Sequence, residues 1–155
     1  MKRRRSGHIS FVSSEVGQFA IYGYSAFAPT KFALRGLADA LQMELMPYDI
    51  NVSILYPPNT DSESFRKQSM ARTEEMRLIA DTGGLFTPKQ VAEAHVKDIE
   101  NGQYSTWLGL NGWVLSVATA GASPERSVFR ALTQVLFAGI FRLLMIVYLR
   151  KFNGI

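Results

Sequence analysis

The hydrophobic residues in the first part of the chain form two short continuous runs, at residues 8–12 and 51–56. Both are rich in β-branched or aromatic residues. The first ends at Ser13-Ser14 and the second at Pro57-Pro58. Such runs are typical of buried strands. Between them, residues 25–45 carry apolar side chains at steps of three and four, which predicts a helix. Its predicted apolar face consists of Phe32, Leu34, Leu37, Leu41 and Leu45.

The order of strand, helix and strand predicts a βαβ unit, in which the two strands are parallel. Residues 59–86 mix turn formers with charged residues, which predicts a mobile loop with a short helix near residues 73–80. Thr87-Pro88-Lys89-Gln90 has the pattern of a capping box and predicts a helix that continues to about Glu100. Residues 104–108 are predicted to form a third strand.

The last quarter of the chain is strongly apolar. Within the 19 residues from 131 to 149, the only charged side chain is Arg142. A helix of this length and composition can span a membrane. It can also lie in the interface, or be buried in a dimer, with the Arg142 side chain reaching water. We therefore divide the chain into a domain at residues 1–110 and an apolar, membrane-associated segment at residues 111–155.

Composition and charge exclude several classes of function. The chain has no cysteine and only two histidines, His8 and His95, so neither a thiolate nucleophile nor a metal site is expected. Of the 17 basic residues, four stand at positions 2–5, and the other thirteen balance the 13 acidic residues. We interpret that basic run as a solvated helix end and not as a nucleic-acid contact. No apolar stretch follows it, as a signal peptide would require.

Three motifs occur in an order that resembles a known family. The serine pair ends the first strand, and Lys31 follows four residues after Phe27, which itself lies thirteen residues after Ser14. The run Pro57-Pro58-Asn59-Thr60 follows the second strand. This order is similar to the C-terminal half of a short-chain dehydrogenase/reductase. The resemblance implies an α/β fold: the C-terminal half of a Rossmann-type doubly wound parallel sheet, followed by an apolar helical membrane-associated tail.

The resemblance also implies roles for these residues. In the family, a serine holds the substrate carbonyl, a tyrosine donates the proton, and a lysine lowers the pKa of the tyrosine and binds the nicotinamide ribose. Ser14 would be the serine, with Ser13 as the alternative, and Lys31 would be the lysine. Pro57, Pro58, Asn59 and Thr60 would form the loop that closes on the cofactor.

Two departures from the family pattern stand out. The position of the tyrosine holds Phe27, which has no proton to donate, and Tyr24 lies seven residues before Lys31 instead of four. The strand, Gly-rich turn and helix that bind the pyrophosphate in this family have no counterpart in the sequence. The resemblance thus implies that the chain begins inside the fold and is inactive or impaired by itself.

Residues 11–14, 31–44 and 56–61 are similar to the branch of the family that reduces 3-ketosphinganine with NADPH. That branch works at the cytosolic face of the endoplasmic reticulum membrane, so the resemblance implies a long-chain keto sphingoid base as substrate and the membrane as a partner. One alternative is a non-catalytic relative that forms dimers with intact enzymes through the helix at residues 25–45, which would also allow a homo-oligomer. Another is a reductase of a different lipid or steroid ketone.

Overall fold

The computed structural model of the protein describes residues 1–80 and 84–150. Its centre is a sheet of three parallel strands in the order β1 (Gly7–Val12), β2 (Ile50–Leu55) and β3 (Ser105–Thr106). The register of β1 and β2 runs from Gly7 beside Ile50 to Val12 beside Leu55. The predicted parallel pairing is thus confirmed. The third strand is shorter than predicted, because only two of its residues pair with β2.

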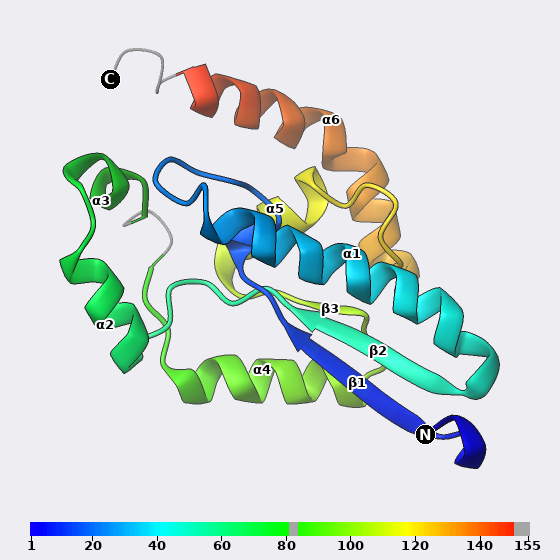
Figure 1. The fold of residues 1–155 in the computed structure, drawn as a ribbon. Helices are drawn as coiled ribbons and strands as arrows, with labels where there is room; N and C mark the ends of the chain where they lie inside the picture. Colours follow the sequence, from blue (N-terminus) through cyan, green and yellow to red (C-terminus); the bar gives the residue numbers. More distant parts are fainter. Residues whose placement is uncertain (81–83, 151–155) are drawn as a thin grey trace.

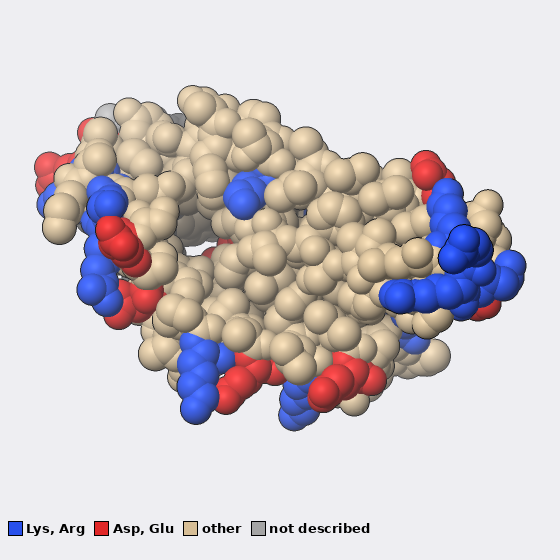
Figure 2. Space-filling view, turned by 60° about the horizontal axis from the view of Figure 1, so that its bottom comes forward, with Lys and Arg blue, Asp and Glu red and all other residues tan. Residues whose placement is uncertain are grey.

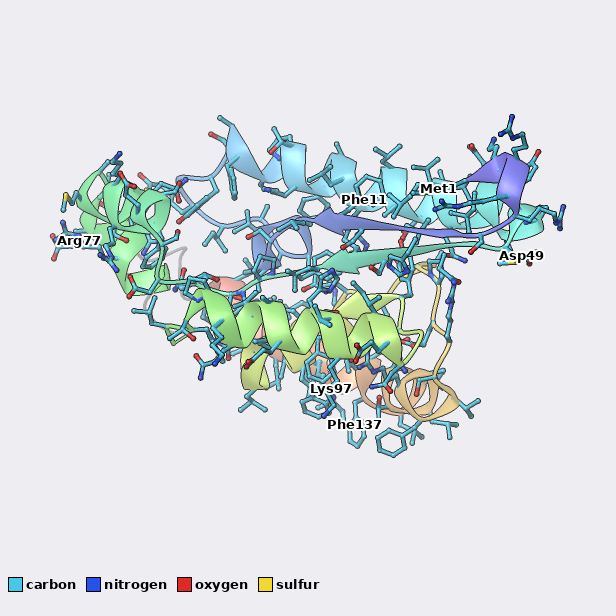
Figure 3. All side chains as sticks on the ribbon, turned by 90° about the horizontal axis from the view of Figure 1, so that it is seen from below. Met1, Phe11, Asp49, Arg77, Lys97 and Phe137 are labelled. Atoms are coloured by element: carbon cyan, nitrogen blue, oxygen red, sulfur yellow. The ribbon has the colours of Figure 1, made fainter. Side chains whose placement is uncertain are left out.

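Helices cover both faces of this sheet. Figures 1 and 3 show α1 (Phe27–Leu45) on one face and α4 (Pro88–Glu100) on the other. The core between α1 and the sheet contains Ala38 and Leu45 of α1 with Val52, Ile54 and Tyr104 from the sheet side. Parallel strands with a helix on each face form part of a Rossmann-type doubly wound sheet, which confirms the predicted fold class.

The predicted apolar face of α1 is partly wrong. Phe32 and Leu37 are 40% and 47% exposed, whereas the buried residues of the helix are Ala28, Ala38, Gln42 and Leu45. Small residues let α1 approach the sheet closely, and the buried Gln42 side chain accepts a hydrogen bond from the backbone N–H of Val52 at 3.1 Å. Of the predicted face, Leu45 is buried and Leu41 packs against the core, whereas the positions of Phe32 and Leu37 are exposed.

The segment between β2 and α4 contains more helix than predicted. α3 (Glu74–Ala80) matches the predicted short helix, but α2 (Glu63–Met70) lies where a loop was expected. Ser62 caps α2 by accepting a hydrogen bond from the N–H of Phe65 at 3.2 Å. Residues 81–83 of the predicted loop lie outside the described residues. The capping box at Thr87 and Gln90 is confirmed, with both reciprocal bonds present.

Single turns of 3₁₀ helix occur at η1 (Lys2–Arg4), η2 (Glu15–Gly17) and η3 (Met46–Tyr48). Figure 2 shows basic side chains gathered at the end of the molecule where Figure 1 places the N-terminus. This end is opposite α2 and α3, so the basic cluster stands apart from the carboxyl ends of the strands.

Two further helices, α5 (Gly109–Ala118) and α6 (Val128–Arg150), follow the sheet and pack against each other. Trp113 of α5 lies edge-on to Phe141 of α6, with ring centroids 5.2 Å apart. α6 is long and apolar enough to cross a membrane by length and composition. Residues 151–155, the end of the predicted apolar segment, lie outside the described residues, and the predicted domain boundary at residue 110 stays a prediction.

Candidate active site

A cavity of about 820 Å³ lies at the carboxyl ends of β1 and β2. Because parallel strands end at the same edge of a sheet, the residues that follow β1 and those that follow β2 meet there. Ser13 and Ser14 line the cavity after β1, and residues 57–60 line it after β2. Phe27 and Lys31 line it from the first turns of α1. The structure therefore brings all the predicted site residues to one cavity.

The two serines have different surroundings. Ser13 is only 2% exposed, and its hydroxyl donates to the backbone carbonyl of Lys31 at 2.9 Å. Ser13 thereby ties the end of β1 to α1. Ser14 is less buried, and its hydroxyl oxygen accepts from the backbone N–H of Val16 at 3.2 Å, which caps η2. That arrangement leaves the Ser14 hydroxyl hydrogen able to donate toward the cavity.

Gly17 allows α1 to approach this serine pair. A Cβ at position 17 would meet the Ser13 hydroxyl oxygen and would lie 2.9 Å from the carbonyl oxygen of Lys31. Only a residue without a side chain fits between η2 and α1. The glycine thus helps to set the distance between the serines and the lysine.

Lys31 extends from α1 back toward the end of β1. Its ammonium group donates to the carbonyl of Val12 at 3.3 Å and lies 5.3 Å from the centre of the Phe27 ring. The Tyr24 ring, which also lines the cavity, is 5.9 Å from the Phe27 ring. The cation, the phenyl ring and a neighbouring phenol therefore form one cluster at the cavity wall.

Backbone hydrogen bonds hold the loop that follows β2. The N–H of Glu15 donates to the carbonyl of Pro57 at 3.2 Å, which joins the loop to η2. The Thr60 hydroxyl donates to the carbonyl of Pro58 at 2.9 Å. The N–H of Phe86 donates to the carbonyl of Asn59 at 2.9 Å. The loop is thus fixed to η2 and to Phe86, and the Thr60 side chain braces it internally.

The sequence analysis missed two charged residues of the cavity wall, Glu15 and Arg72. The Glu15 Oε1 atom is buried with no hydrogen-bond partner among the described residues, and burial raises the pKa of this carboxyl to about 7. Arg72 is 8% exposed and its guanidinium lies over the Phe65 ring at 4.9 Å. Arg72 reaches the cavity through tertiary packing, which no local pattern signals, whereas Glu15 is the direct neighbour of Ser14.

The two histidines form hydrogen bonds with residues of the sheet. The His8 ring is 2.8 Å from the Ser53 hydroxyl, and the His95 ring contacts the hydroxyls of Ser10 and Thr106 at 2.5 and 2.9 Å. Burial lowers the pKa of both imidazoles. Within residues 1–80 and 84–150, no group of three or more metal-ligating side chains occurs.

Known proteins resemble this chain in sequence and in fold. A family model described as short chain dehydrogenase matches residues 1–73. The chain is 45% identical over 155 residues to 3-dehydrosphinganine reductase of Danio rerio, covering 100% of this chain and 47% of that protein. It is 44% identical over the same length to 3-ketodihydrosphingosine reductase of Bos taurus, again with 47% of that protein covered. The chain therefore spans about half the length of the curated relatives it matches.

The solved structures that it resembles include a short-chain dehydrogenase from Streptomyces avermitilis, with a TM-score of 0.57, 19% identity, and coverage of 99% of this chain and 54% of that one. At this identity the likeness concerns the fold alone. The sequence matches and the motifs around the cavity lead to one conclusion: this chain resembles the short-chain dehydrogenase/reductase family in sequence, and its fold is that of the solved members.

Proposed function

We propose that this chain carries the substrate-binding half of a 3-ketosphinganine reductase site that works with NADPH at the cytosolic face of the endoplasmic reticulum membrane. The observation that supports the proposal is the convergence of Ser14, Lys31 and residues 57–60 on one cavity, in a chain whose relatives are named for this ketone. Phe27 at the position of the proton donor makes the chain by itself inactive in reduction.

The proposed roles follow from the chemistry of ketone reduction, which needs a hydride at the carbon and a proton at the oxygen. NADPH supplies the hydride when it is bound. Ser14 donates a hydrogen bond to the carbonyl oxygen, where negative charge develops. Lys31 places its cation beside the ring at position 27, where it would favour the phenolate form of a tyrosine. A phenyl ring at this position offers no proton.

The residues present fit one end of the cofactor. Lys31 would hold the ribose next to the nicotinamide, and Pro57, Pro58, Asn59 and Thr60 would close over the ring. The described part of the chain has no strand that leads through a Gly-rich turn into a helix, so the pyrophosphate has no cradle there. NADPH bound by this chain alone would therefore be held only at its nicotinamide end.

The cavity also fits a long-chain substrate. The serines and Lys31 are among the polar residues of its wall, and Phe19, Ile21 and Leu115 are among the apolar ones. A molecule with a ketone near one end and an alkyl chain beyond it matches this division. Sphingoid ketones have this form.

The test supplies an N-terminal half from a relative and then varies the residue at position 27. The N-terminal half of the Danio rerio reductase is joined before residue 1, with either Phe27 or the Phe27→Tyr substitution. NADPH oxidation by 3-ketosphinganine is then measured. The Tyr form is expected to turn over about 10²–10⁴ times faster than the Phe form, the usual contribution of a general acid.

Two controls separate the roles at the site. In the Phe27→Tyr background, Ser14→Ala is expected to lower the rate about 10²-fold or more through loss of the carbonyl hydrogen bond. Phe19→Tyr in the Phe27 form adds a phenol elsewhere in the cavity and is expected to leave the rate low. Equal rates for the Phe and Tyr forms would contradict the role of position 27. A steroid ketone that outcompetes 3-ketosphinganine would contradict the substrate.

The outward face of α1 favours a second candidate, a non-catalytic chain that pairs with intact reductases. Phe32, Leu37 and Met43 are large apolar residues exposed on this helix. A helix that exposes such residues is suited to packing against another subunit. Co-purification of the chain with a full-length reductase, lost on Leu37→Glu, would support this role. A failure of the unsubstituted chain to associate would exclude it.

A further inference from the structure

α6 carries two different apolar faces. Six large residues at steps of three and four form an exposed stripe: Phe129, Leu132, Leu136, Ile140, Leu143 and Val147. At about 100° per residue these positions lie along one side of the helix. We call them the outer stripe. Phe141, Leu144, Met145 and Tyr148 lie on an adjacent side, where the last three line the cavity.

The helix is fastened to the rest of the molecule along most of its length. Near its start, the Arg130 guanidinium pairs with Asp98 at 3.2 Å and donates to the carbonyl of Ser105 at 2.8 Å. In its middle, the Phe141 ring packs against Trp113. Near its end, the Tyr148 ring lies 6.3 Å from the Phe19 ring beside the loop that follows η2. Figure 1 shows the same course, with α6 running across the molecule instead of projecting from it.

These contacts limit the orientations in which α6 can bind a membrane. With 23 residues, the helix is about 35 Å long at 1.5 Å per residue, enough to cross a hydrocarbon core of about 30 Å. Crossing would surround the helix with lipid and would break the Arg130 pair, the Trp113 contact and the Tyr148 contact. Lying flat keeps all three and still buries the outer stripe.

The charges of α6 favour lipid as the occupant of the outer stripe. The helix contains Arg130, Arg142 and Arg150 but no aspartate or glutamate. Arg142 and Arg150 are exposed. By helical geometry, Arg142 lies more than a quarter of a turn from the centre of the stripe, so its guanidinium can reach phosphate groups while the stripe enters the acyl region.

We infer that α6 lies in the plane of a lipid bilayer surface, with the outer stripe among the acyl chains, and forms the wall across which a long-chain amphiphile passes sideways from the bilayer into the cavity. This inference rests on the proposed function for the identity of the amphiphile, but not for the orientation of the helix. Leu110 of α5 lines the same cavity and is largely exposed, so the apolar surface continues around the rim. A substrate that follows this route keeps its alkyl chain out of water.

Orientation is tested with single cysteines, because the chain has none of its own. Val128→Cys and Leu149→Cys are placed at the two ends of α6, at exposed positions that lie outside the outer stripe, and each variant of the full chain is bound to sealed vesicles of phosphatidylcholine and phosphatidylserine. A membrane-impermeant maleimide added outside is expected to label both sites fully. Labelling of Leu149→Cys only after detergent would show that α6 crosses the bilayer and would overturn the inference.

The outer stripe is tested by flotation with the same vesicles. Leu136→Glu and Leu143→Glu are each expected to lower partitioning about tenfold, since each removes a leucine from the acyl region. Val96→Glu, which alters an exposed apolar residue of α4, is the matched control and is expected to leave partitioning unchanged. Equal effects of all three substitutions would contradict the stripe. A stable dimer of the chain without vesicles that Leu143→Glu abolishes would assign the stripe to a second copy instead.

The route is tested with an environment-sensitive fluorophore on Met145→Cys, at the cavity wall, and on Leu143→Cys, in the outer stripe. Adding 3-ketosphinganine to the vesicles is expected to shift the emission at position 145 and not at position 143. Equal shifts at both positions would refute the route. None of these measurements needs turnover. A chain that lies flat but does not respond to this ketone therefore contradicts the proposed substrate, whereas a crossing helix contradicts the orientation.

Discussion

The carboxyl group of Glu15 gives the sharpest quantitative prediction. This residue follows Ser14 directly and lines the cavity, and its Oε1 atom is buried without a hydrogen-bond partner among the described residues. Burial is the physical cause that raises the pKa of the carboxyl from 4.5 to about 7. We therefore expect the replacement Glu15→Gln, which keeps the shape and removes the charge, to stabilise the protein above neutral pH.

The magnitude follows from the displacement of the pKa. A change from 4.5 to about 7 corresponds to about 2 to 3 kcal/mol, because one pKa unit equals about 1.4 kcal/mol and the side chain is only partly buried. Between these two pH values the folded protein holds the proton and the unfolded chain has released it. The free energy of unfolding therefore falls as the pH rises from about 4.5 to about 7 and then levels off.

The assay is urea unfolding of the unsubstituted chain and of Glu15→Gln at pH 4.5, 6, 7 and 8. The two proteins are expected to differ little at pH 4.5, and the variant should be about 2 to 3 kcal/mol more stable at pH 8. Glu100→Gln, at the exposed end of α4, is the matched control, because the charge that it removes is not buried. A difference between the two proteins that is the same at every pH would refute the reasoning.

Four other substitutions test the packing around the site and the tail by thermal or urea unfolding. Gly17→Ala is expected to cost about 1 to 3 kcal/mol, because its Cβ would lie 2.9 Å from the Lys31 carbonyl oxygen, and a neutral result would contradict the close approach. Gly36→Ala, with open space around its Cβ, is expected to gain about 0.5 to 1 kcal/mol from helix propensity, so a loss of stability there would count against the description of α1. Arg130→Met is expected to cost about 1 to 3 kcal/mol by leaving the partly buried Asp98 carboxylate unpaired, and Asp98→Asn in the same chain should recover part of that cost. Simple additivity of the last two substitutions would exclude the ion pair.

Local sequence patterns were sufficient for most of the secondary structure. The strands at residues 8–12 and 51–56 and the capping box at Thr87 were predictable because they depend on neighbouring residues. α2 was missed because its eight residues, of sequence ESFRKQSM, contain little apolar signal and its cap is a single serine. The buried face of α1 was misjudged because Ala28, Ala38 and Gln42 face the sheet, and small or polar residues carry no weight in a hydrophobic pattern.

For the candidate site, too, some features were predictable from the sequence and others were not. Ser14, Phe27, Lys31 and residues 57–60 were singled out because their order and spacing resemble the family motif. They meet at one cavity because parallel strands bring their carboxyl ends to one edge of the sheet. The different hydrogen bonds of Ser13 and Ser14 became visible only once η2 and α1 were in place.

The sequence alone determined the βαβ order, and the resemblance to the family with Phe27 where its tyrosine is expected, since these depend on residue type and spacing. Only the tertiary structure decided that Arg72 enters the cavity and that α6 lines it with Tyr148. The reason is distance along the chain: more than a hundred residues separate Ser14 from Tyr148, and only packing brings the two to the same cavity. Hydropathy identified α6 as apolar, but the contacts of Arg130 and Tyr148 set how the helix lies against the domain.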